Sequence, residues 1–392
     1  MAWVFDAGYG IVEHEGQRPG SMGIVTPRSY IVGRSGNREP LRLPSAAVAS
    51  IVLVFSLAAG TGCTSHMHTQ LTTADQGPVP RLSADVDPRF SYGYEEIPFA
   101  NHVVGEGATS NYTLRELTIP SAGVSPQGDR EIRAKYYRSE LSGPRPLLIT
   151  LPIYARFTYP SDKVSTFVQK HSKGAYHVVE VEGKNFLINW YSLADTDDEE
   201  HFLDLFREGV EAERLVVIDL RRLIDWAEQQ PEIDGDRIGL VGFSRSAIVA
   251  ATLATQEPRL AATVLVVGGA HPHTIVARCE GVRTAAIQKN AARQFGWDRD
   301  ELEARLKPIF AVVDPANYPG RVDPETVLMI EAARDDCVVK ESSDALYEAM
   351  GHPEIFTLNY GHRTAFLSMT MLGGNWMCDR ILEFLDKRFQ RN

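Results

Sequence analysis

Apolar and polar positions change their pattern along the chain, and from about residue 108 the pattern is that of a folded domain. Residues 112–120 and 131–138 alternate like half-buried strands, and the turn-like residues 123–128 between them predict an antiparallel pair. Residues 146–153 (PLLITLPI) form a nearly continuous apolar run, which is typical of a buried parallel strand.

Strand-like and helix-like segments alternate through the rest of this region. Further strands are predicted at 176–181, 238–241, 262–267, 327–332 and 355–358, and helices at 164–171, 199–230, 247–255, 342–350 and 378–389. This alternation predicts an α/β fold with a mostly parallel sheet and helices on both faces. Residues 271–320 interrupt it with helix-like segments, which we expect to form a helical insertion above the sheet edge.

The residues before this domain have a different pattern. Residues 45–60 (SAAVASIVLVFSLAAG) are uncharged and apolar and follow three arginines, as in a secretory signal peptide. The run is shorter than the roughly 20 apolar residues of a membrane span. Residues 1–33 lack any such pattern, so we interpret 1–63 as an over-extended start, with the true start at Met22 or later, followed by a signal peptide.

Cys63 follows the apolar run directly, in the sequence GTGCTS. A cysteine after an apolar segment and a small residue resembles the lipidation motif of bacterial lipoproteins, although Gly60 stands where that family has leucine. Two interpretations stay open, and both predict export: a lipid anchor at Cys63 on the bacterial cell envelope, or secretion after ordinary cleavage. Residues 64–107, rich in polar residues, Pro and Gly, are predicted to be a linker to a domain at 108–392.

The stretch 237–246, RIGLVGFSRS, carries the most specific signal for chemistry. A predicted strand ends in Gly242-Phe243-Ser244-Arg245-Ser246, and a predicted helix follows at once. This is the context of the G-x-S-x-G nucleophile elbow, which presents a serine at the carboxyl-terminal edge of a sheet. The final glycine of that motif is Ser246 here, a small residue that we expect to be tolerated.

A serine of this kind needs an acid and a histidine, which follow it in that order along the chain. Asp335 and Asp336 come just after the predicted strand at 327–332, and His362 follows the predicted strand at 355–358. Both positions match the places where the partners of Ser244 are required.

The segments DGDRIGLVGFSRSA, ARDDCVV and YGHR together resemble the α/β-hydrolase superfamily, especially its dienelactone-hydrolase and prolyl-oligopeptidase-like branches, over residues 110–390. The resemblance implies that Ser244 is the nucleophile and His362 the general base and acid. It implies Asp336 as the orienting acid, because Asp336-Cys337-Val338-Val339 fits the D-x-V/I-V pattern of such loops; Asp335 is the alternative.

The resemblance also implies an oxyanion site made of two backbone N–H groups. The first is expected from Arg245, the residue after the nucleophile. The second is expected from the loop LPIYARFTYP after the strand at 146–153, at Ile153 or Tyr154, and the Tyr154 hydroxyl is an alternative donor. The glycines that the family often carries in this loop are absent here.

The insertion at 271–320 is expected to lie over this site as a lid. Its apolar residues have helical spacing, so they would either line a partly apolar acyl pocket or pack against the core; they are Ile275, Val276, Ile287, Phe295, Trp297, Leu302 and Leu306.

Composition narrows the range of partners. The chain has 40 basic and 51 acidic residues, a net charge of −11, which disfavours nucleic acid because phosphate binding needs a basic face. No cofactor motif is present, and no metal site is expected, because Cys279, Cys337 and Cys378 lack C-x-x-C spacing. In an exported protein two of these three cysteines could form a disulfide, and the pair stays open.

The sequence therefore predicts an exported serine hydrolase that cleaves a small carboxylic ester or thioester through an acyl-enzyme. Two alternatives stay open. A serine peptidase of the prolyl-oligopeptidase kind is disfavoured, because only about a hundred residues precede the domain, too few for the propeller of that class. A non-catalytic binding lipoprotein with the same fold is disfavoured by the intact set of serine, acid and histidine.

Overall fold

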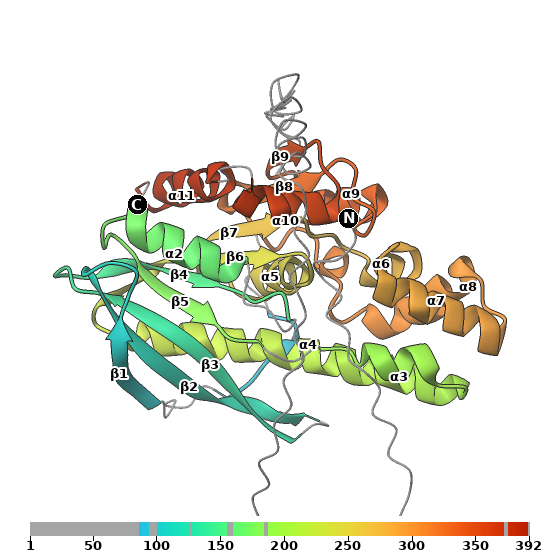
Figure 1. Ribbon diagram of the computed structural model, residues 1–392. Helices are drawn as coiled ribbons and strands as arrows, with labels where there is room; N and C mark the ends of the chain where they lie inside the picture. Colours follow the sequence, from blue (N-terminus) through green and yellow to red (C-terminus); the bar gives the residue numbers. More distant parts are fainter. Residues whose placement is uncertain are drawn as a thin grey trace, which may run out of the picture. The chain divides into compact units, whose positions relative to one another are not determined.

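The computed structural model describes residues 86–93, 100–125, 128–154, 160–183, 187–371 and 375–390. Their strands form one sheet of nine, in the order β1-β2-β3-β5-β4-β6-β7-β8-β9 (Figure 1). The strands are β1 (Ala100–Glu106), β2 (Tyr112–Ser125), β3 (Gly128–Ser139), β4 (Arg145–Thr150), β5 (His177–Val181), β6 (Ile233–Phe243), β7 (Leu260–Val266), β8 (Val327–Ala332) and β9 (Glu354–Leu358).

The sheet has an antiparallel part and a parallel part. The strands β1, β2 and β3 pair antiparallel, and β3 also pairs antiparallel with β5. From β5 to β9 all neighbours run parallel. This confirms the predicted α/β fold with a mostly parallel sheet. Since the parallel strands share one direction, all their carboxyl ends meet at one edge of the sheet.

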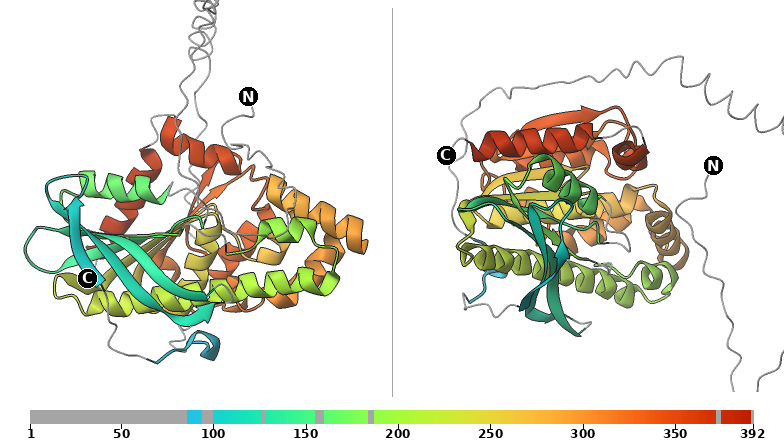
Figure 2. Two further views of the ribbon diagram at one scale, coloured as in Figure 1. Left: turned by 60° about the horizontal axis from the view of Figure 1, so that its bottom comes forward. Right: turned by 60° about the vertical axis from the view of Figure 1, so that its left-hand side comes forward.

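Helices cover both faces of the sheet, and Figure 2 shows α4 and α11 on opposite sides of the strands. The helices are α2 (Ser161–His171), α3 (Trp190–Asp195), α4 (Glu199–Glu228), α5 (Arg245–Gln256), α6 (Pro272–Arg278), α7 (Val282–Phe295), α8 (Arg299–Phe310), α9 (Lys340–Ala349), α10 (His362–Met371) and α11 (Trp376–Phe389). Short 3₁₀ helices are η1 (Pro88–Phe90), η2 (Pro315–Asn317) and η3 (Pro324–Thr326).

Alternate residues of each buried strand face alternate helix layers. On β4, Leu147 and Ile149 join the core cluster that holds the buried faces of α4, α5 and α9. Leu148, between them, joins the cluster of α2 and α11. Apolar side chains make up both clusters, which explains why the strand is a nearly continuous apolar run in the sequence.

The longest helix, α4, begins and ends where its sequence requires. The side chain of Asp198 accepts a hydrogen bond of 2.8 Å from the backbone N–H of His201, and Glu199 and Glu200 occupy the first turn, where the helix dipole favours negative charge. Pro231 lies three residues beyond the last helical residue, consistent with the predicted end of the helix.

Residues 271–320 form the predicted helical insertion, made of α6, α7, α8 and η2 beside α3 (Figure 1). Of the two roles left open for its apolar residues, packing is observed for all those named except Ile275, which is half-buried and outside the cluster. Val276, Ile287, Trp297, Leu302 and Leu306 are buried in a cluster with Phe202, Phe206 and Val210 of α4, and Phe295 packs against it. These side chains fill a core between the insertion and α4.

The folded domain begins earlier than predicted. The proposed linker 64–107 contains η1 and β1, and Phe90 of η1 is fully buried in the core cluster of α4 and α5. The reason is that Phe90 and Tyr92 are isolated apolar residues in a polar segment, which no periodicity singles out. Residues 86–93 are therefore part of the domain.

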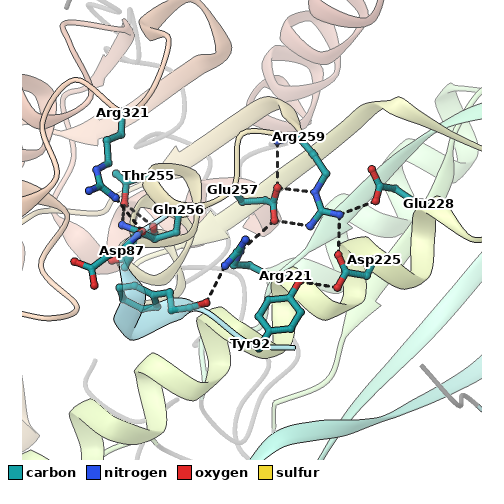
Figure 3. A network of polar contacts seen from close by, with 12 residues as sticks. Asp87, Tyr92, Arg221, Asp225, Glu228, Thr255, Gln256, Glu257, Arg259 and Arg321 are labelled. Atoms are coloured by element: carbon teal, nitrogen blue, oxygen red, sulfur yellow. Dashed lines mark hydrogen bonds and ion pairs between the residues drawn. The ribbon is translucent and has the colours of Figure 1, made fainter. Parts of the chain in front are cut away.

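A polar network holds residues 86–93 in place (Figure 3). Arg221 of α4 donates to the carbonyl oxygen of Phe90 at 2.8 Å and to Glu257 at 3.2 Å, and Tyr92 donates to Asp225 at 2.6 Å. Arg259 joins the network through Glu257 and Asp225. We call these contacts the clasp. Because Glu257 and Arg259 precede β7, the clasp lies at the amino-terminal edge of the parallel strands.

His177, at the start of β5, is buried as a neutral imidazole. Its Nδ1 accepts a hydrogen bond of 3.0 Å from the backbone N–H of Ser139, so the proton is on Nε2, which donates to the Glu232 carbonyl oxygen at 2.9 Å. Burial lowers the pKa of His177 from 6.5 to about 4. A second proton, on Nδ1, would face the Ser139 backbone N–H, so two hydrogen-bond donors would oppose each other.

We expect His177 to make the domain less stable as pH falls from 6.5 to about 4. In this window the unfolded chain binds a proton that the folded state excludes, so the stabilisation present above pH 6.5 is lost on acidification. The shift corresponds to at most about 3 kcal/mol. Urea unfolding between pH 7 and 4.5 measures it, and His177→Gln should flatten the dependence, whereas His201→Gln, at an exposed position, should not.

Candidate active site

Ser244 occupies a strained turn between β6 and α5. Its backbone has φ of 50° and ψ of −114°, a conformation that few residues other than glycine adopt. The N–H of Ser244 donates to the carbonyl oxygen of Val266 on β7 at 2.8 Å, which ties the turn to the neighbouring strand. The serine therefore stands at the carboxyl-terminal edge of the sheet, as a nucleophile elbow requires.

Two small residues close this elbow, and Ser246 does more than the sequence suggests. Its hydroxyl accepts from the Phe243 N–H at 2.8 Å and lies 3.0 Å from the Phe243 carbonyl oxygen, to which it donates. Gly242 meets the backbone of the same turn: an added Cβ would overlap the Ser246 carbonyl oxygen and lie 2.9 Å from Ala247 Cα. Ser246, in the last position of the motif, thus stabilises the turn through its two hydrogen bonds to Phe243.

Gly242→Ala is expected to disrupt the elbow, because backbone atoms cannot yield to the added methyl group. The cost should exceed the roughly 1–3 kcal/mol of an ordinary overpacked core site, and the Ser244 hydroxyl should be displaced. Thermal unfolding and the rate of covalent labelling at Ser244 measure both effects. Gly235→Ala is the matched control, because there the nearest atom to an added Cβ is a flexible side-chain carbon at 3.5 Å.

His362 connects the serine to a carboxylate. Ser244 Oγ lies 2.9 Å from His362 Nε2, and His362 Nδ1 lies 2.8 Å from Asp335 Oδ2. Since a carboxylate only accepts hydrogen bonds, the imidazole proton is on Nδ1, and Nε2 is left to accept from the serine hydroxyl. The structure brings Ser244 and His362 together as the sequence predicted.

The acid beside His362 is Asp335, so the preference for Asp336 was wrong. The side chain of Asp335 is 4% exposed, and its second oxygen accepts from the N–H groups of Cys337 and Val338 at 2.8 and 2.7 Å. Asp336 is exposed to solvent. The loop turns back over the carboxylate of Asp335, and this turn directs the neighbouring side chain outward.

The loop between β7 and α6 packs closely between α5 and the loop that carries Asp335, and the sequence analysis did not single it out. A Cβ on Gly268 would lie 2.6 Å from Ala247 Cβ in the first turn of α5. A Cβ on Gly269 would lie 2.7 Å from Val338 Cγ1, in the loop between β8 and α9. The two glycines therefore let the backbone pass between α5 and the loop that carries Asp335. A Gly-Gly pair directly after an apolar strand was the available signal.

Arg245, the residue after Ser244, forms an ion pair with a buried carboxylate. Its guanidinium forms an ion pair with Glu213 of α4, whose side chain is fully buried. Burial raises the pKa of Glu213, the charge of Arg245 opposes this rise, and the nearby charge of Asp314 adds to it. No motif links residues 213 and 245 in the sequence, so only the fold reveals the pair.

The expected oxyanion donors lie at the correct edge of the sheet. Arg245 is the first residue of α5, and a helix cannot satisfy the N–H groups of its first turn internally. Thr150, at the end of β4, pairs with Val241 of β6, so Ile153 and Tyr154 follow a strand adjacent to the one that leads to Ser244. The ring of Tyr154 is buried in the core cluster, and its backbone has φ of 52°.

The remaining predictions concern the lipidation site, the other three cysteines and a metal site. Cys63 lies outside the described residues. The disulfide joins Cys279 and Cys337, and Cys378 is a buried thiol whose pKa burial raises to about 12. In the described part of the chain no group of His, Cys, Asp or Glu side chains could hold a metal ion, and no helix there has the length and apolarity to cross a membrane.

One family model matches part of the chain. Residues 221–347 match the family described as BAAT / Acyl-CoA thioester hydrolase C terminal, a span that includes Ser244 and Asp335 and ends before His362. No curated protein matches the chain.

Two solved structures resemble the whole domain. Acetyl xylan esterase 1 from Thermoanaerobacterium sp. JW/SL YS485 is 18% identical, with a TM-score of 0.54 over 74% of this chain and 88% of the esterase. Acetyl xylan esterase from Paenibacillus sp. R4 is 15% identical, with a TM-score of 0.53 over 75% of this chain and 90% of the esterase. The parallel sheet, the serine elbow and these similarities show that the chain has the α/β-hydrolase fold.

Proposed function

We propose that this protein is a serine hydrolase that cleaves a carboxylic ester or thioester through an acyl-enzyme intermediate. The observation that carries the proposal is the continuous chain of contacts from Ser244 through His362 to Asp335. A serine hydroxyl is a weak nucleophile until a positioned base accepts its proton, and this arrangement supplies that base.

The reaction follows from the placement of these groups. Ser244 Oγ attacks the carbonyl carbon while its proton passes to His362 Nε2, and Asp335 stabilises the imidazolium that forms. The N–H of Arg245 and a second donor at Ile153 or Tyr154 stabilise the oxyanion. His362 then protonates the departing alcohol or thiol, and a water molecule activated by the same histidine hydrolyses the acyl-serine.

The choice of an ester or thioester rests on two findings. The matching family model is described by acyl-CoA thioester hydrolysis, and the two similar structures are acetyl xylan esterases. We also propose that the protein is exported, on the cell envelope through Cys63 or secreted. The disulfide Cys279–Cys337 supports this proposal, because disulfides persist in oxidising compartments.

A fluorophosphonate probe tests the proposal. We expect the folded protein to be modified at Ser244, as located by peptide mass spectrometry, and the Ser244→Ala variant to be unmodified. Hydrolysis of p-nitrophenyl esters of increasing acyl length and of acyl thioesters, compared with aminoacyl anilides, then identifies the bond that is cleaved. Absence of labelling in the folded wild-type protein would overturn the serine mechanism, and preferential cleavage of the anilides would overturn the ester assignment.

A further inference from the structure

The disulfide joins the helical insertion to the loop that carries Asp335. Cys279 is the residue after the last turn of α6, and Cys337 lies two residues beyond Asp335. The N–H of Cys337 is also one of the two backbone donors to Asp335 Oδ1. A single residue is therefore covalently bonded to the insertion and hydrogen-bonded to the acid that faces His362.

The loop between β8 and α9, residues 333–339, carries Asp335, and we call it the acid loop. Its two halves are held by different parts of the fold. The first half is fixed by the last strand and the histidine segment: Ala333 N–H donates to Leu358 O at 2.7 Å, and Arg334 N–H donates to Tyr360 O at 3.0 Å. The second half is fixed by the insertion, through the disulfide and through a hydrogen bond of 2.9 Å from Glu280 N–H to Asp336 O. Asp335 lies where the two halves meet.

The insertion side of the disulfide is a rigid support. Cys279 is 1% exposed, and its N–H donates to Ile275 O at 2.9 Å within α6. Its carbonyl oxygen accepts from the side chains of Thr284 and Gln288 on α7, each at 3.0 Å. Both helices fix the position of Cys279. The disulfide therefore restrains Cys337 and the loop that carries Asp335.

We propose that the Cys279–Cys337 disulfide is a positioning element for the hydrolase: it holds the N–H groups of Cys337 and Val338 where they orient Asp335 toward His362, so that reducing it slows the acylation of Ser244. This inference rests on the proposed function. Reduction by a dithiol such as dithiothreitol transfers two electrons and two protons to the disulfide, giving two protein thiols and the cyclic disulfide of the reagent.

The expected effect is on the chemical step. Displacement of a reacting group by about 1 Å costs on the order of 100-fold in rate, so we expect reduction to lower kcat and the rate of fluorophosphonate labelling by about 10- to 100-fold. KM for p-nitrophenyl acetate should change by less than about threefold, because neither cysteine is among the residues proposed to contact the substrate. The Cys337→Ser variant should reproduce the loss, since it keeps the backbone N–H and removes only the cross-link.

A second variant separates positioning from a general loss of structure. In the Asp335→Asn background the acid is already absent, so removing the disulfide should produce no further decrease in labelling rate. Cys378→Ser is the matched control: it leaves the cross-link intact and should respond to reduction as the wild-type protein does. Circular dichroism confirms folding in each case, and alkylation with intact-mass measurement confirms reduction.

Each outcome bears on one proposal. A labelling rate unchanged by confirmed reduction, or an equal proportional loss in the Asp335→Asn background, would overturn the positioning role and leave the hydrolase intact. Failure of the oxidised wild-type protein to label at Ser244 would overturn the proposed function and this inference with it.

Discussion

Asp335→Asn is expected to lower kcat by about four orders of magnitude, whereas Asp336→Asn should change it by less than about threefold. In a serine hydrolase the same change at the orienting acid costs about 10⁴-fold, because an amide favours the wrong imidazole tautomer. Asp335 Oδ2 accepts a hydrogen bond of 2.8 Å from His362 Nδ1–H, while Asp336 is exposed. The two variants differ by one position in the same loop, so each serves as the control for the other.

The measurement is kcat and KM with an activated ester, together with the labelling rate of Ser244. In Asp335→Asn we expect both kcat and labelling to fall while KM stays near its original value, because the acid does not contact substrate. If Asp336→Asn proved to be the damaging change, the observed contact between Asp335 and His362 would not be the one used in catalysis.

Glu213→Ala is expected to destabilise the domain by about 3–5 kcal/mol, the usual cost of leaving one partner of a buried ion pair alone. Glu213 is fully buried, and the guanidinium that it would leave unpaired belongs to Arg245, beside Ser244. Activity should fall with stability, because the unpaired guanidinium would pull toward solvent the residue whose N–H is the expected oxyanion donor.

Urea unfolding measures the first effect, and kcat at a temperature well below the midpoint of unfolding measures the second. The matched control is Glu211→Ala, on the same helix, whose partner Arg214 is three residues away and whose side chain is 45% exposed; it should cost less than about 1 kcal/mol. The double variant Glu213→Met with Arg245→Met should recover most of the stability. A small effect of Glu213→Ala alone would mean that the ion pair does not support the elbow.

The sequence was sufficient for the parts of the fold that depend on local pattern. A short continuous apolar run between turns is typical of a buried strand, so the sequence predicts β4 and the strand at 327–332, the latter with its observed ends. The elbow was also local, because Gly242 and Ser244 must stand two residues apart on one turn. His362 was found by chain order, although it begins α10 directly and does not lie within a loop.

The choice between Asp335 and Asp336 could not be made from pattern. The two residues are identical in type and adjacent, and what separates them is the direction of the turn, with the N–H groups of Cys337 and Val338 folded back on the first carboxylate. The pairing of Glu213 with Arg245 was hidden for a related reason. A glutamate on a long amphipathic helix is ordinarily solvated, and only the packing of α4 against α5 removes this one from water.

The position of the clasp around residues 86–93 has a consequence for attaching the domain to a support. It fastens the incoming chain at the amino-terminal edge of the parallel strands, while Ser244, Asp335 and His362 follow the carboxyl-terminal ends. A carrier attached at residues 86–93 would therefore lie at the edge of the sheet opposite Ser244. The fold separates the point of attachment from the point of chemistry by the full length of the strands.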